Sequence, residues 1–250
     1  LSNNVASYII YNKQDKGAIQ MIGDMQSWTP NVAGIIEHAM KVHPKTEIIS
    51  RLVSGEIHRS NYEEVCIRSR KLASVLAKDG YKEGDVLATL ALNTYRHLEM
   101  YYGISGMGAI THTLNFRLHP EQAVYIINHA EDKIIFVESP FVPILEAIQD
   151  QIPTVEKFIV LCEENELPET SLKNAISYEE YIKGGDENYV WPTLKDDAAC
   201  GLCYTSGTTG NPKGVLYSHK SNVIHAQAAL TAMTISPDDS ILMVVPLFHV

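Results

Sequence analysis

The feature that most constrains the fold is the regular alternation of short apolar runs with helical stretches between residues 86 and 162. The runs show little alternation of polar and apolar residues, which is typical of strands buried on both faces. Strands that alternate with helices form parallel sheets covered on both sides. We therefore predict an α/β fold with a largely parallel sheet and helices on both faces, with strands at residues 86–92, 109–114, 133–138 and 157–162.

Domain organisation is predicted from the same pattern. Residues 60–225 are expected to form one α/β subdomain, and residues 1–59 and 226–250 to be parts of a second, incomplete one. Ser54-Gly55 predicts a hairpin between two short strands. The polar stretch 163–195 is either a subdomain boundary or a surface excursion. Ligands are expected at the carboxyl ends of the strands, as in other open α/β sheets.

Several helix starts are predicted from capping residues. Thr29 followed by Pro30 is typical of an N-cap and the first helical residue. Ser60 and Ser177 are each followed three residues later by glutamate, which is the spacing of a capping box. His219 is interpreted as a cap between a strand and a helix.

Composition excludes several classes of protein. The chain has 20 Lys and Arg against 30 Asp and Glu, a net charge of −10, and so lacks the cationic character of a nucleic-acid-binding protein. Four cysteines in 250 residues are too few for a disulfide scaffold. No signal peptide is recognised, and the longest uncharged stretch, 100–116, is too polar for a membrane helix. We expect a cytoplasmic protein without an integral membrane segment, with peripheral membrane contact and a homodimer left open.

The segment most informative about chemistry is YTSGTTGNPKG, residues 204–214. Its glycines allow the backbone to approach a ligand closely, and its amide groups can form an anion-binding loop. Four hydroxyl groups and the Lys213 ammonium add donors and positive charge, a combination suited to a polyphosphate. The spacing differs from a Walker P-loop, because Lys213 follows Pro212 and precedes Gly214.

This segment resembles the phosphate-loop signature of the adenylate-forming superfamily, which includes acyl-CoA synthetases, peptide-synthetase adenylation domains and beetle luciferases. Residues 245–250, VPLFHV, are similar to a second element of that family, and residues 93–133 look most like medium- and long-chain fatty-acyl-CoA synthetases. Phe116 is a departure, because many relatives have proline there. The resemblance covers essentially the whole chain, as an incomplete N-terminal adenylation domain whose C-terminal domain is absent.

The resemblance implies a reaction in two halves. A fatty acid attacks the α-phosphate of ATP to give acyl-adenylate and pyrophosphate, and coenzyme A then displaces AMP. Lys213 is implied to be catalytic, and Thr205 to ligate Mg²⁺. The residues implied to hold the ATP phosphates are Thr205, Ser206, Gly207, Thr208, Thr209, Gly210 and Lys213. His249 is implied to be catalytic and, with Val250, to line the substrate site.

Other residues that could carry chemistry are interpreted as structural. Cys200 and Cys203 form a CxxC on an apolar strand, where residues three apart point to opposite faces, so no metal or redox role is expected. Two alternatives stay open for the function: a stand-alone nucleotide- or phosphate-binding module, and an adenylation domain for another carboxylic acid. The chain length of the acid is not specified by these residues.

Overall fold

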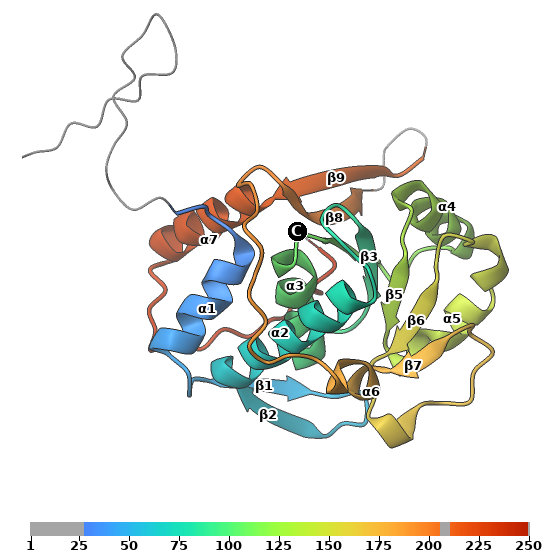
Figure 1. The fold of residues 1–250 in the computed structure, drawn as a ribbon, viewed down its shortest axis with the longest axis horizontal. Helices are drawn as coiled ribbons and strands as arrows, with labels where there is room; N and C mark the ends of the chain where they lie inside the picture. The colour runs from blue at the N-terminus through green and yellow to red at the C-terminus, as the bar shows by residue number, and fades with distance from the viewer. Residues whose placement is uncertain (1–27, 206–210, 250) are drawn as a thin grey trace, which may run out of the picture.

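The computed structural model describes residues 28–205 and 211–249, and within them seven strands form one sheet with the order β7-β6-β5-β3-β4-β8-β9 (Figure 1). Pairing is parallel from β7 to β8, and only the edge strand β9 runs antiparallel, to β8. The prediction of a largely parallel sheet is confirmed. The strands are β3 (Val86–Leu90), β4 (Ile110–Thr113), β5 (Ile134–Val137), β6 (Lys157–Val160), β7 (Ala175–Ser177), β8 (Ala199–Thr205) and β9 (Lys213–Ser218).

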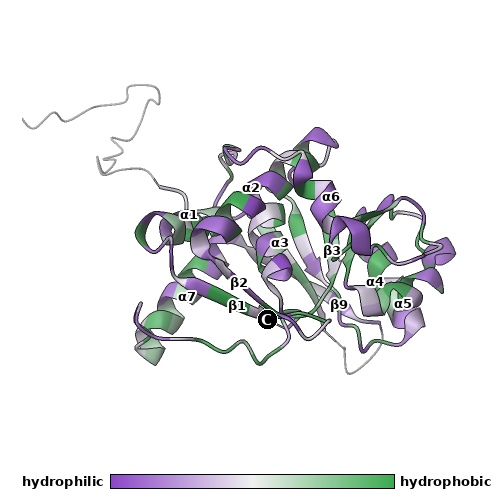
Figure 2. Cartoon of the chain, turned by 90° about the horizontal axis from the view of Figure 1, so that it is seen from below, coloured by the Kyte–Doolittle hydropathy of each residue, from purple (hydrophilic) through white to green (hydrophobic). Residues whose placement is uncertain are grey.

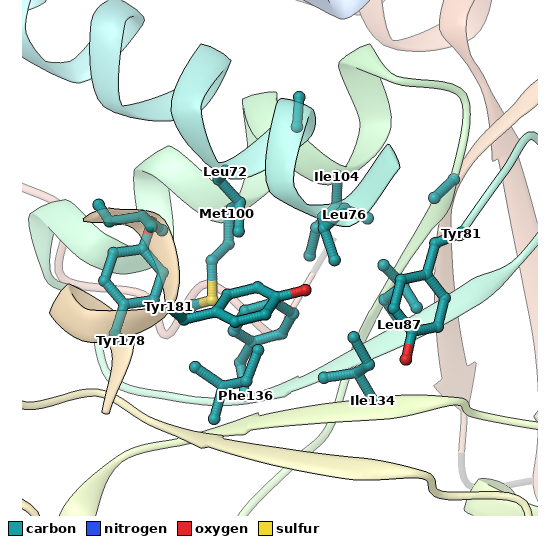
Figure 3. Close-up of a cluster of buried hydrophobic side chains, with 14 of the residues drawn as sticks. Leu72, Leu76, Tyr81, Leu87, Met100, Ile104, Ile134, Phe136, Tyr178 and Tyr181 are labelled. Carbon is teal, nitrogen blue, oxygen red and sulfur yellow. The ribbon is translucent and has the colours of Figure 1, made fainter. Parts of the chain in front are cut away.

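Helices cover both faces of the sheet, as predicted. On one face, α2 (Tyr62–Lys78), α3 (Tyr95–Gly106) and α6 (Tyr178–Lys183) pack on the strands through a cluster of buried side chains that Figure 3 shows. On the other face, α4 (Pro120–Ala130) and α5 (Val142–Glu146) cover alternate residues of the same strands. In β5, for example, Phe136 belongs to the first cluster and Ile135 to the second. Because both faces are covered, the strands read as continuous apolar runs.

The chain reverses its direction across the sheet after β4. From β3 it passes through α3 to β4 on one side, and from β4 through α4 to β5 on the other side of β3. The chain therefore leaves β3 and β4 toward opposite faces of the sheet, which makes their carboxyl ends a topological switch point. Such a switch point is where open α/β sheets bind ligands.

A buried ion cluster fixes α3 against its neighbours. Arg68 on α2 lies 2.6 Å from Glu99 on α3 and 2.9 Å from Glu179 on α6. Arg96, at the start of α3, lies 2.8 Å from the same Glu179 carboxylate. Tyr178 donates a further hydrogen bond of 2.9 Å to Glu99, which has no solvent exposure. Each buried carboxylate thus has charged or hydroxyl partners, as burial requires.

The remaining elements surround this sheet. The predicted hairpin is present as β1 (Glu47–Arg51) and β2 (Ile57–Asn61), which pair antiparallel. Helix α1 (Val32–Val42) packs on α2 and α3, and α7 (His219–Met233) lies beside α1 (Figure 1). The polar stretch 163–195 is a surface excursion that adds β7 to the sheet edge and α6 to one face. The assignment of residues 1–59, 60–225 and 226–250 to two subdomains stays a prediction.

Three predicted helix caps were wrong by one or two residues. Asn31, not Thr29, caps α1, and Asn61, not Ser60, caps α2. The Ser60 hydroxyl instead donates to Ile48 O in the hairpin. Ser218 caps α7, while His219 is its buried first residue and accepts a hydrogen bond from Val32 N at 3.3 Å. The Ser177 cap was predicted correctly.

Figure 2 shows hydrophobic residues gathered along the strands and hydrophilic residues on the outward turns of the helices. Across residues 28–205 and 211–249, no helix combines the length and the apolar character needed to cross a membrane.

The close approach of α6 to α2 gives a test of this packing. A Cβ atom at Gly185 would lie 2.5 Å from Lys71 O and 2.6 Å from Lys71 Cα, so backbone would have to move. We expect Gly185→Ala to lower the free energy of unfolding by about 1–3 kcal/mol in denaturant titrations of the full-length protein. Gly184→Ala is the matched control, because a Cβ there meets nothing within 4 Å. Equal stability of the two variants would contradict the packing.

Candidate active site

Thr205 and Lys213 are brought together at one end of the β8–β9 hairpin. They are register partners across this antiparallel pair, and both are exposed. Side chains of directly opposed residues project from the same face of a sheet. The side chains that carry the hydroxyl and the ammonium group therefore leave the same face of the hairpin at the strand ends that flank the glycine- and threonine-rich loop. The predicted site residues Ser206, Gly207, Thr208, Thr209 and Gly210, like Val250, lie outside the described residues.

The end of β8 is attached to α4 through Tyr204. The Tyr204 hydroxyl shares a hydrogen bond of 2.6 Å with His129 Nδ1, and burial raises the pKa of Tyr204 to about 12, so the phenol stays protonated. Beneath it, His112 Nδ1 lies 2.8 Å from the Asp132 carboxylate, and both side chains are fully buried. Burial raises the pKa of Asp132, and the contact with His112 acts in the opposite direction. These contacts hold the strand end that precedes the loop.

The segment that carries His249 lies beside the same edge of the sheet. Thr113, the last residue of β4, has its Oγ1 3.2 Å from Cys203 Sγ on β8 and 3.5 Å from Phe248 O. His249 is exposed, and its ring lies 4.5 Å from the ring of Phe248. The end of β8, which leads into the predicted phosphate loop, and the segment that ends in the predicted substrate-lining histidine therefore both lie beside the carboxyl end of β4.

Phe116, which departs from the family pattern, belongs to an aromatic group at this edge. Its ring stacks on Phe141 at 4.9 Å and meets the edge of Phe248 at 5.1 Å. Phe248 is 5% exposed. The departure therefore fills space between the loop after β4 and the His249 segment, and it adds apolar contact there.

Glu138 is a residue that the sequence reasoning missed. It follows β5 directly, is buried, and accepts a hydrogen bond from Leu92 N at 3.3 Å. Burial raises its pKa to about 7, against smaller opposing effects of the Leu92 amide and Arg96. The sequence did offer one signal of a buried carboxyl group, because Glu138 comes immediately after a fully apolar strand.

The CxxC cysteines have separate partners, as expected for opposite faces of a strand. Cys200 Sγ accepts a hydrogen bond of 3.0 Å from Asn222, and Cys203 lies against Thr113. Both are free thiols. No group of three or more His, Cys, Asp or Glu side chains suited to a metal occurs in the described part of the chain.

Residues 36–250 match the family described as AMP-binding enzyme. The chain belongs to the AMP-binding enzyme family. A medium-chain-fatty-acid–CoA ligase of Ectopseudomonas oleovorans is 45% identical over 92% of this chain and 42% of its own length. A 3-methylmercaptopropionyl-CoA ligase of Ruegeria lacuscaerulensis is 43% identical over 92% of this chain and 43% of its own length. The chain thus spans less than half the length of these curated relatives.

A solved structure supports the fold of this AMP-binding enzyme. The crystal structure of a putative long-chain-fatty-acid CoA ligase from Rhodopseudomonas palustris aligns with a TM-score of 0.75, at 19% identity, over 88% of this chain and 52% of that one. The predicted fold class, an α/β domain of the adenylate-forming type, is confirmed.

The raised pKa of Glu138 predicts how stability depends on pH. An unfolded glutamate ionises near pH 4.5, whereas Glu138 keeps its proton until about pH 7, so the folded protein binds more protons between these values. Stability is therefore lost as pH rises from 5 to 8, by up to about 3 kcal/mol from this residue. In denaturant titrations at pH 5 and pH 8, Glu138→Gln should lose less stability than wild type. The exposed Glu121→Gln is the control, and an unchanged pH dependence in Glu138→Gln would contradict the assignment.

Proposed function

We propose that the full-length protein containing this chain activates a fatty acid with ATP and transfers the acyl group to coenzyme A. The first step joins the carboxylate to the α-phosphate and releases pyrophosphate, and the second forms the thioester and releases AMP. The observation that carries the proposal is the pairing of Thr205 with Lys213 at the carboxyl edge of the sheet, beside the His249 segment. Membership of the AMP-binding enzyme family and the names of the relatives support it.

The positive charge of Lys213 determines what the Thr205–Lys213 pair can contribute to the first step. A carboxylate and a triphosphate repel each other, so their approach requires positive charge and donors that are already in place. Lys213 is exposed, so its ammonium group can reach the β- and γ-phosphates. The hydroxyl and amide groups of residues 205–210 would add donors to the same phosphates.

The donor set fits Mg²⁺ only together with ATP. Thr205 offers one hydroxyl oxygen, and the described residues add no cluster of carboxylates around it. Mg²⁺ commonly takes phosphate oxygens and water alongside few protein ligands. We assign Thr205 as its protein ligand, where the ion would neutralise phosphate charge.

On the acid side, we propose that His249 and Val250 line the carboxylate site, with Phe248 and Phe116 supplying apolar contact behind them. The names of two relatives of nearly equal identity point to acids of different size. A panel of short-, medium- and long-chain acids in an acid-dependent ATP–pyrophosphate exchange assay identifies the substrate. Binding of ATP without exchange for any acid would instead favour a nucleotide-binding module.

Lys213→Ala separates the two half-reactions. We expect ATP–pyrophosphate exchange by the full-length protein to fall by about 100-fold, because an ammonium group that stabilises phosphate charge is lost. Thioester formation from supplied acyl-adenylate and coenzyme A should be nearly unchanged, because that step involves no β- or γ-phosphate. Lys220→Ala is the matched control, since Lys220 is exposed on α7 and pairs with Asp196 at 2.7 Å. Equal loss in both half-reactions would contradict the role of Lys213.

A further inference from the structure

The segment that leads to His249 is poorly held by its own side chains. Residues 241–249 form no helix or strand, and Leu242 and Val244 are 84% and 75% exposed. Figure 2 shows much of the stretch that follows α7 in the green of hydrophobic residues. Phe248 is its one buried side chain among the described residues. An irregular backbone with so little burial needs other groups to define its course.

Asn93 supplies these groups. Its Nδ2 donates hydrogen bonds to Met243 O at 3.0 Å and to Val245 O at 2.8 Å, and its Oδ1 accepts one from Leu247 N at 2.8 Å. Both amide protons and the carbonyl oxygen are therefore used on one five-residue stretch, 243–247. A carboxamide is the side-chain group of this size that donates twice and accepts at once.

The loop that presents Asn93 is itself fixed. Leu92 N donates to the Glu138 carboxyl at 3.3 Å, and Leu92 O lies 3.1 Å from His97 Nδ1. His97 is completely buried, and its Nε2 lies 3.0 Å from Thr89 Oγ1 on β3. Burial lowers the pKa of His97 to about 4, so the ring is neutral and acts as one donor and one acceptor. The backbone immediately before Asn93 is thus fixed at the switch point between β3 and β4.

Two further contacts continue the path toward His249. The Tyr101 hydroxyl on α3 donates to Leu247 O, and Phe248 packs against Phe116. Asn93 defines positions 243–247, and these contacts define 247 and 248. His249 follows directly, so its place at the edge of the sheet depends on how the preceding backbone is held.

We propose that Asn93 is a positioning residue for the acid-binding side of the site, and that it acts by holding the backbone of residues 243–247 and thereby His249. The proposal rests on the proposed function in that His249 is taken to face the acid. All three side-chain hydrogen bonds of Asn93 among the described residues go to residues 243–247 and none to Thr205 or Lys213, so the phosphate side should not depend on it.

Asn93→Asp in the full-length protein tests this role, because aspartate keeps the shape and the acceptor but loses both donors. We expect the KM for the acid to rise by about 10-fold or more, with less than a twofold change in the KM for ATP. Amide hydrogen exchange of residues 243–249 should become faster. Asn174→Asp is the matched control, since Asn174 also donates to a distant carbonyl, Glu156 O at 3.0 Å, away from this segment.

The outcomes separate the two proposals. A wild-type KM for the acid in Asn93→Asp, or equal rises in both KM values, would overturn the positioning role. Unchanged hydrogen exchange at residues 243–249 would overturn the backbone contact. If the wild-type protein shows no acid-dependent exchange of pyrophosphate, the proposed function fails, and the acid-positioning role with it. Faster hydrogen exchange in the variant would then still establish that Asn93 holds this segment.

Discussion

The parallel pairing of β3 with β4 on one side and β5 on the other is the constraint on which the rest of the structure depends. It forces the connections through α3 and α4 onto opposite faces, and both faces are then buried. The carboxyl ends of β3, β4 and β8 consequently meet at one edge. Thr205, Lys213 and the segment that carries His249 lie at these strand ends.

At the carboxyl ends of the strands, the structure depends on hydrogen bonds to polar groups more than on the burial of apolar surface. Strand ends and irregular segments carry backbone amides and carbonyls that have no partners in a sheet. Glu138 and His97 pair with the backbone amide and carbonyl of Leu92. Asn93 forms hydrogen bonds with two carbonyls and one amide of residues 243–247. The same side chains that complete the hydrogen bonding also determine the course of the segment before His249. Stability and site geometry are therefore coupled through a few polar residues.

Prediction from the sequence succeeded where local patterns and tertiary structure agree. The apolar runs located β3, β5 and β6 because burial on both faces leaves a continuous apolar signal. The predicted N-caps of α2 and α7 were wrong by one residue, because at each position two adjacent residues could cap the helix. Contacts with distant segments determined which residue caps each helix. The Ser60 hydroxyl donates a hydrogen bond to Ile48 O, and His219 Nδ1 accepts one from Val32 N. Such partners lie many residues away and leave no local pattern.

The sequence by itself determined the α/β class, the family and the choice of Thr205 and Lys213 as candidate site residues, because strand periodicity and the motif at residues 204–214 are local properties of the chain. Only the tertiary structure decided that Thr205 pairs with Lys213, that burial raises the pKa of Glu138 to about 7, and that Asn93 holds the segment before His249. The physical reason is that burial and hydrogen bonding between segments 46 or 150 residues apart arise when the sheet assembles.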